Sequence, residues 1–154
     1  MSVTPERLAV LPIFAALDLR QRQSLAQVLQ ERFYLPGEQV FAMGDKAWGC
    51  YFVLDGVVEV QVTGAEGPRT VATLGKGELF GEVALLDHGR RSAGCVAGGA
   101  GAALAELSRP EFDLIFNAGN TFAYKLMDLI ATQLVRRLRH ATETLTEAAV
   151  REQT

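Results

Sequence analysis

The pattern of hydrophobic and polar positions divides the chain into three parts. In residues 1–31, apolar side chains such as Leu25 and Val28 recur at helical spacing, which predicts short helices. In residues 32–108, short and often alternating apolar runs are separated by glycine, proline and aspartate, which predicts strands and turns. Residues 109–149 return to a helical pattern. The pattern therefore predicts a mainly β fold with flanking helices, ending in a long C-terminal helix.

The clearest strand is Val58–Val62, whose period of two places three valines on one face. Asp55-Gly56 stands just before this run and predicts a tight hairpin turn. About seven or eight such strands within roughly 75 residues suit a small antiparallel β-barrel or jelly roll. Residues 94–101 are rich in glycine and make a poor strand sequence, so we expect local flexibility there.

The last helix carries two apolar stripes, and a break at residues 117–120 is expected to precede it. One stripe advances in alternating steps of three and four, which is the seam of a coiled coil, and consists of Tyr124, Met127, Ala131, Leu134, Leu138, Ala141, Leu145 and Ala148. The other stripe, Leu126, Leu129 and Ile130, is expected to face the barrel. Two apolar sides predict a homodimer through the Tyr124–Ala148 helix. The alternative is one wide face laid on the chain's own core.

Composition agrees with one globular domain over residues 1–154. The chain is 49% hydrophobic and 21% charged, with no membrane-spanning run and no secretory signal in its first residues, so we expect a cytoplasmic protein. Cys50 and Cys95 lie in expected strands, and in a reducing compartment we interpret them as buried free thiols. With two histidines in the sequence, we expect no metal site.

The net charge of −3 argues against a surface that collects nucleic acid by general electrostatics. Residues 136–140, RRLRH, are a local exception, and this run either touches phosphates or is a solvated helix face. The sequence contains no GxSxG, HExxH or P-loop motif, so we expect no enzymatic activity.

Residues 77–93 hold the strongest chemical signal. Gly81 lets the backbone approach another group closely, and Glu82 begins a short segment, residues 82–86, whose first amide groups attract an anion. Arg91 follows a short loop and can return its guanidinium to the same place to hold a phosphate. Glu82 would repel that phosphate, so it fits better as the acceptor of a neighbouring sugar hydroxyl. The alternative is a surface ion pair between Glu82 and Arg91 that closes the loop.

Residues 80–86, FGEVALL, followed by Arg91-Ser92-Ala93, resemble the phosphate-binding cassette of the cyclic nucleotide-binding domain family. That family includes the catabolite activator protein, protein kinase A regulatory subunits and cyclic nucleotide-gated channels. The glycine-punctuated runs at residues 35–38, 51–56 and 74–82 resemble the family's barrel as well. The similarity covers roughly Leu11 to Arg139 and spans cassette residues 80–93.

The resemblance implies a barrel that buries a cyclic nucleotide, cAMP rather than cGMP, with no further cofactor. It assigns Glu82 to the ribose 2′-hydroxyl and Arg91 and Ser92 to the cyclic phosphate. Backbone donors are expected from the cassette, whose ligand-binding residues are Gly81, Glu82, Val83, Ala84, Arg91, Ser92 and Ala93. On the last helix Thr142 keeps one of two hydroxyl positions that meet the base, and Ala141 replaces the other. Arg90 stands where many members have proline. Arg91 is the arginine expected to face inward, because Ser92-Ala93 follows it as in the family's motif.

Transcription factors of this family append a winged helix. Nine residues follow Leu145 here, too few for a helix-turn-helix, so we expect no direct DNA binding. Because no apolar run is long enough to span a membrane, we also expect no membrane association. A receptor of this kind passes its signal to an unidentified downstream protein or through its own dimer. Two alternatives stay open: a dimeric interaction protein of the same fold that binds no nucleotide, and a haem or iron–sulfur sensor of that fold.

Overall fold

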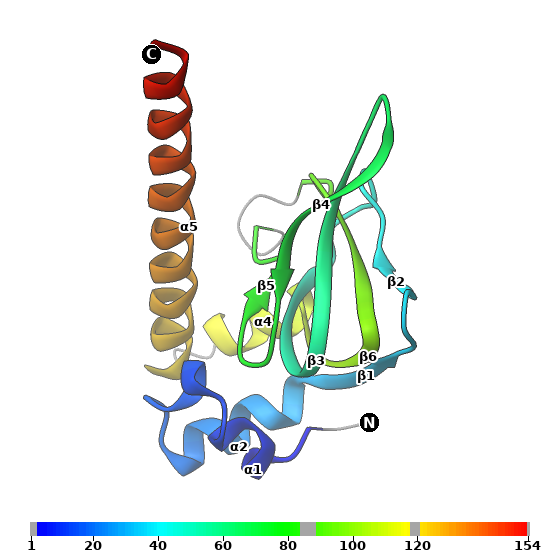
Figure 1. Ribbon diagram of the computed structural model, residues 1–154. Coiled ribbons are helices and arrows are strands. Elements are labelled where there is room, and N and C mark those ends of the chain that lie inside the picture. Colours follow the sequence, from blue (N-terminus) through cyan, green and yellow to red (C-terminus); the bar gives the residue numbers. More distant parts are fainter. Residues whose placement is uncertain (1–2, 84–88, 118–120, 154) are drawn as a thin grey trace.

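A computed structural model describes residues 3–83, 89–117 and 121–153. A group of short helices lies at one end of a sheet, and a long helix stands alongside the sheet (Figure 1). The N-terminal group consists of α1 (Pro5–Ala9), a 3-10 helix η1 (Pro12–Phe14) and α2 (Leu19–Val28). The C-terminal helices are α4 (Arg109–Asn117) and α5 (Thr121–Gln153). The predicted break falls between these two helices, on residues 118–120, which lie outside the described part of the chain.

The described residues form one antiparallel sheet of six strands. They are β1 (Gln30–Tyr34), β2 (Gln39–Phe41), β3 (Gly49–Gly64), β4 (Gly67–Leu74), β5 (Leu79–Phe80) and β6 (Gly94–Ser108). The strand order is β1-β6-β3-β4, with β2 paired to β6 and β5 paired to β3. The predicted class, an antiparallel barrel or jelly roll with flanking helices, is confirmed.

Helix starts are set by side-chain caps that the sequence supplies. The side chain of Asp18 accepts a hydrogen bond from the backbone of Gln21, whose side chain accepts one from the Asp18 backbone, and this capping box begins α2. Ser108 and Glu111 make the same reciprocal arrangement at the start of α4. These caps satisfy amide groups that a helix end otherwise leaves without partners.

The prediction of a hairpin turn at Asp55-Gly56 is wrong, because β3 runs straight through these residues. Both sides of the dipeptide pair with β6, and the register shifts there as in a β-bulge. Gly56 has a φ of +79°, and a Cβ on it would lie 2.2 Å from the carbonyl oxygen of Gly101. The missing side chain therefore allows Gly56 to lie close to Gly101 of β6. Because β6 pairs with β3 on both sides of the bulge, β3 continues as one strand and does not turn back.

The prediction that residues 94–101 make a poor strand is wrong for a related reason. These residues form the first part of β6, which pairs with β2 and β3. A Cβ on Gly98 would meet the side chain of Val57 at 2.4 Å, so the missing side chain makes room for the neighbouring strand. Two pairs of expected short strands thus merge into the long strands β3 and β6, which explains why fewer strands are described than were predicted.

Two apolar clusters lie on opposite faces of β3 and β6. Cys50 and Phe52 point into the cluster beneath the helices, which also contains Leu107 of β6. The alternate residue Val53 points into the barrel interior, together with Leu104 of β6. The period of two thus supplies one core under the helices and a second inside the barrel.

The helix α5 is covered unequally along its length. Leu126 and Ile130 are buried in the cluster beneath the helices, as predicted for the barrel-facing stripe. From the predicted coiled-coil seam, Leu134 packs against that cluster, whereas Leu138 and Leu145 are exposed. The seam is therefore divided between the chain's own core and a free surface.

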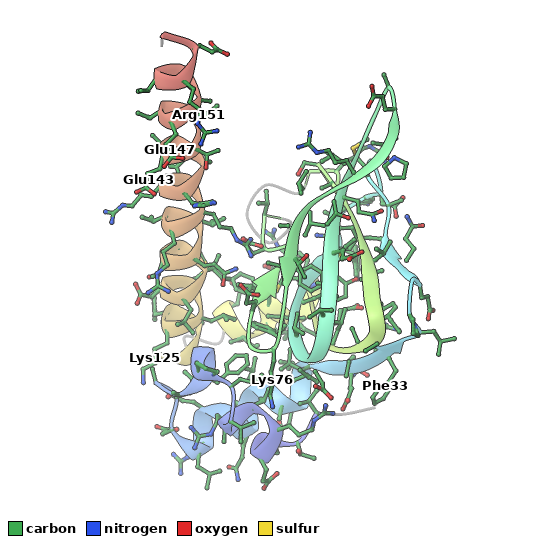
Figure 2. All side chains as sticks on the ribbon, viewed as in Figure 1. Phe33, Lys76, Lys125, Glu143, Glu147 and Arg151 are labelled. Atoms are coloured by element: carbon green, nitrogen blue, oxygen red, sulfur yellow. The ribbon has the colours of Figure 1, made fainter. Side chains whose placement is uncertain are left out.

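The C-terminal part of α5 carries charged side chains, among them Glu143, Glu147 and Arg151, where no other element covers the helix (Figure 2). At the other end of α5, Lys125 bonds to the Ala16 carbonyl and the Gln21 side chain. Within the described residues, no helix combines the length and apolar character needed to cross a membrane.

Candidate ligand-binding site

A cavity of about 1060 Å³ opens between the barrel and α5. Its apolar wall comes from strands, and includes Phe41, Val60, Ala72, Leu74 and Phe80. Its polar wall comes from the cassette and from α5, and includes Gly81–Val83, Arg90–Ala93, Gln133, Arg136, Arg137 and His140. An apolar cavity with a few convergent polar groups is typical of a small-molecule site.

Arg91 is held at the wall of this cavity by its backbone and its side chain. Its backbone N–H donates to Asp45 and its carbonyl accepts from Gly44, each at 2.8 Å. Its guanidinium donates to the carbonyls of Gly81 (3.1 Å) and Gly49 (2.7 Å), and its side chain is buried. These bonds fix the direction of the guanidinium before any ligand arrives.

The guanidinium of Arg91 lies against an aromatic ring, and its Nε makes no bond to the described residues. The guanidinium carbon lies 4.1 Å from the ring centre of Phe41, a cation–π contact. Burial lowers the pKa of Arg91 from its usual value. Its Nε is buried and has no hydrogen-bond partner in the described structure. An unsatisfied buried donor is costly, so this nitrogen is a candidate donor to a ligand in the cavity.

Gly81 shapes the floor of the site by close approach to Arg91. Its φ is +73°, and a Cβ there would lie 2.6 Å from Nη1 of Arg91. The absent side chain therefore lets the Gly81 carbonyl accept the bond from Arg91.

Glu82 is almost completely buried, with 1% of its surface exposed. Its Oε1 accepts a hydrogen bond from Nη1 of Arg137, in an ion pair that joins the cassette to α5. The expected alternative, a surface ion pair between Glu82 and Arg91, is therefore not what forms. Arg91 bonds to backbone carbonyls and Glu82 bonds to a helix that follows much later in the chain.

The carbonyl of Leu79 adds a second link between the site and α5. It accepts hydrogen bonds from Nη2 of Arg137 and from Nε2 of Gln133, which lies one turn earlier on the helix. Three side-chain bonds from α5 thus converge on the segment from Leu79 to Glu82.

Basic groups outnumber acidic groups in the cavity wall. Arg90, Arg91, Arg136, Arg137 and His140 contribute to it, against Glu78 and Glu82. The whole chain has a net charge of −3, so the charge of the cavity wall is opposite in sign to that of the chain as a whole. Such a wall favours an anionic ligand.

The structure brings most of the predicted ligand residues together. Gly81, Glu82, Val83, Arg91, Ser92 and Ala93 all line the cavity. Ala84 lies outside the described residues, as does most of the predicted anion-binding segment 82–86. Of the two neighbouring arginines, Arg91 is buried, whereas Arg90 is exposed and donates to the Gly44 carbonyl.

Thr142 is the predicted residue that the structure does not bring to the cavity. Its hydroxyl donates to the Leu138 carbonyl on its own helix at 2.9 Å, and the residue is exposed. Ala141, just before it, does line the cavity. A contact between Thr142 and the ligand therefore stays a prediction.

Sequence reasoning missed Gln133 and Arg137. The interpretation of residues 136–140 as a solvated face is correct for Arg139, which is exposed, but wrong for Arg137. The signal that could have found them is helical spacing, because residues 133 and 137 continue the stripe that begins with Leu126 and Ile130.

Residues 31–118 match the family model of the cyclic nucleotide-binding domain. This chain belongs to that family. It is 33% identical over 131 residues to the cAMP-dependent protein kinase type II regulatory subunit of Drosophila melanogaster, across 85% of this chain and 35% of that protein. It is 37% identical over 131 residues to the cyclic AMP receptor protein of Thermus thermophilus, across 84% of this chain and 58% of that protein. The chain therefore spans less than two thirds of either relative.

A solved structure supports the same family assignment. The catabolite activator protein of Thermus thermophilus superimposes with a TM-score of 0.76 and 35% identity, covering 90% of this chain and 63% of that chain. The predicted resemblance of the chain to this family is thereby confirmed. Among the described residues, no group of three or more His, Cys, Asp and Glu side chains is placed to hold a metal ion.

Proposed function

We propose that this chain is a non-enzymatic cyclic-nucleotide receptor that binds cAMP in preference to cGMP. The observation that carries the proposal is the free Nε of Arg91, a buried donor at the wall of a cavity rich in positive charge. A singly charged cyclic phosphate supplies the acceptor that this nitrogen lacks. Ser92, which also lines the cavity, would add its hydroxyl to the same phosphate.

The remaining parts of a cyclic nucleotide fit the rest of the cavity. Glu82 would accept the ribose 2′-hydroxyl, and the apolar strand residues Val60 and Leu74 would cover the base. The preference for cAMP is supported by the relatives with 33% and 37% identity, whose names specify cAMP. We place this receptor in the cytoplasm.

We propose that the signal leaves through α5. Arg137 and Gln133 join this helix to Leu79 and Glu82, so a ligand that displaces either residue also acts on the helix. The change would reach an unidentified downstream protein or a second copy of the chain. In this proposal α5 can take two positions, and a ligand shifts the helix toward the position to which it binds more tightly.

The proposed dimer uses α5 of two chains. The helix has 33 residues and is therefore about 50 Å long. Leu138 and Leu145 are 68% and 71% exposed, and they continue the predicted seam beyond the chain's own core. This surface also supports the second candidate function, a dimeric interaction protein that binds no nucleotide.

Isothermal titration of cAMP and cGMP separates these functions, using protein that has been unfolded and refolded to remove carried-over ligand. We expect cAMP to bind with a Kd of about 1 μM or below, and Arg91→Gln to weaken binding by at least about tenfold. The matched control is Arg69→Gln, which removes the same charge from an exposed position of β4 outside the cavity wall. Arg90→Gln is expected to weaken binding less than Arg91→Gln does.

Thermal unfolding of each variant shows whether it is folded. Folded wild-type protein that releases no heat with either nucleotide would refute the receptor function and favour the interaction protein. Equal losses of affinity in Arg91→Gln and Arg69→Gln would refute the phosphate assignment alone.

A further inference from the structure

Two basic side chains of α5 line the cavity without a bond to any other described residue. They are Arg136 and His140, which lie one turn apart on the same face of the helix. Both residues are exposed. Arg137, which lies between them in the sequence, is already paired with Glu82. The wall therefore offers a basic pair that nothing in the described structure neutralises.

The helix itself brings no negative charge to Arg136. The residues three and four positions away from it are uncharged or basic, namely Thr132, Gln133, Arg139 and His140. Basic groups at these spacings repel one another when they are charged, and this repulsion destabilises a helix. An anion bound at the pair would remove the repulsion.

A cyclic mononucleotide leaves this basic pair without a partner. It brings one negative charge to the cavity, and the proposed function assigns that charge to Arg91, while the base is neutral. Glu78, the other acidic residue of the wall, accepts a hydrogen bond from the backbone of Gly75. The cavity wall thus has basic groups for one more anionic group than a cyclic mononucleotide carries.

The size of the cavity agrees with this excess. Its volume of about 1060 Å³ lies at the upper end of the range of roughly 300–1,000 Å³ that small-molecule sites occupy. Its wall on α5 extends from Leu129 to Ala141, which is about 18 Å along the helix axis. Arg91 comes from the barrel side and the basic pair comes from the helix side, so two separate anionic groups can be bound on two walls.

We propose that Arg136 and His140 form a second phosphate subsite, and that the ligand class is a nucleotide with two phosphates, such as a cyclic dinucleotide. This inference rests on the proposed receptor function and extends it. Arg91 binds the first phosphate, and the basic pair on α5 binds the second. The run at residues 136–140 then contacts phosphate through its cavity-lining members, whereas Arg139 is exposed outside the wall.

The test compares cAMP with cyclic di-AMP, which has the same base and sugar but carries a second nucleotide unit and a second phosphate. Each is titrated calorimetrically into the refolded chain. The variants are Arg136→Gln, the double variant Arg136→Gln/His140→Gln, and Arg139→Gln. Arg139→Gln is the matched control because it removes an arginine from the same helix at an exposed position outside the cavity wall.

We expect the wild-type chain and Arg139→Gln to bind cyclic di-AMP at least about tenfold more tightly than cAMP, because charge-assisted bonds hold the second phosphate. Arg136→Gln should reduce this ratio to about threefold or less, and the double variant should bring it to about one. The affinity for cAMP should change by about threefold or less in every variant, because cAMP brings no phosphate to the basic pair.

A second arm separates a second phosphate of the ligand from a free phosphate ion. The cAMP titration is repeated with inorganic phosphate present, and we expect no gain in affinity for cAMP. If phosphate tightens cAMP binding in the wild-type chain but not in Arg136→Gln, the subsite takes a free ion, and the assignment to a dinucleotide is overturned.

Three further outcomes would overturn the inference while leaving the receptor function intact. Cyclic di-AMP that binds no more tightly than cAMP would show that the cavity has no second phosphate subsite. A wild-type ratio in Arg136→Gln and in the double variant would show that the basic pair is only solvated. An equal loss in Arg139→Gln and Arg136→Gln would show that general electrostatics of the helix attracts the ligand. If the folded wild-type chain binds neither nucleotide, the proposed function fails as well.

Discussion

The two halves of α5 differ in what covers them. The first half, residues 121–137, buries Ile130 completely and supplies the side chains that reach the cassette. The second half, residues 138–153, exposes Leu138 and Leu145 on a surface that no other described element covers. The barrel-facing stripe is therefore covered by the chain's own core, whereas the seam residues of the second half are exposed. Periodicity shows that a helix face is apolar, but it does not show what lies against that face.

The largest expected effect separates the two halves by stability. Ile130→Ala should lower the free energy of unfolding by about 2–5 kcal/mol, because it leaves a cavity in a fully buried core. Leu145→Ala should change it by about 0.5 kcal/mol or less in dilute protein, because the side chain is exposed in the single chain. Urea denaturation at low protein concentration measures both. Similar losses in the two variants would show that the second half of α5 is as firmly packed as the first.

The next effect concerns assembly rather than stability. If the second half of α5 forms the dimer, replacing Leu138 and Leu145 together by glutamate should convert the dimer to a monomer, because opposed carboxylates would face one another in an apolar seam. Sedimentation equilibrium gives the mass of the wild-type chain and the variant. Arg139→Gln is a suitable control on the same helix. A wild-type chain that is monomeric at high concentration, or a variant that remains dimeric, contradicts the proposed seam.

The smallest expected effect is the alkylation of the two native cysteines, which provides a low background for labelling a cysteine introduced on α5. Cys50 and Cys95 are buried and free, burial raises the pKa of Cys50, and it raises the pKa of Cys95 to about 12. Since only the thiolate reacts, the folded wild-type chain should take up almost no alkylating reagent at pH 8.

Leu145→Cys should take up one equivalent, and a dimer should protect that thiol as protein concentration rises. Rapid labelling of the folded wild-type chain would show that the barrel opens. Mass spectrometry reads the uptake.

Local sequence patterns predicted the fold class and the family well. Alternation in Val58–Val62 indicated a strand, and these residues lie in β3. Asp55-Gly56 was wrongly predicted to be a turn. The positive φ of Gly56 belongs to a bulge in β3, and β6 pairs with β3 on both sides of that bulge. Turn chemistry is local, whereas the choice between a turn and a bulge depends on which strand lies alongside.

The residues of the candidate site were also predicted only in part from local sequence patterns. The cassette pattern predicted Gly81, Glu82 and Arg91, and the structure brings them to one cavity wall, while their roles in binding stay proposals. Arg91 could be preferred over Arg90 by the residues that follow it, and burial separates the two arginines in the structure. Helical spacing could place Arg137 on the barrel-facing stripe of α5, but it could not identify Glu82 as the partner of Arg137.

The sequence by itself determined which segments are strands and helices over most of the chain, which residues resemble the family's cassette, and which helix is apolar on two sides. These properties depend on residues close together in the chain. Only the tertiary structure decided that Arg137 meets Glu82 across 55 residues, and that Leu134 of the helix seam packs against the chain's own core while Leu138 and Leu145 stay exposed. Both depend on how α5 packs against the barrel, and that packing is set by contacts between residues far apart in sequence.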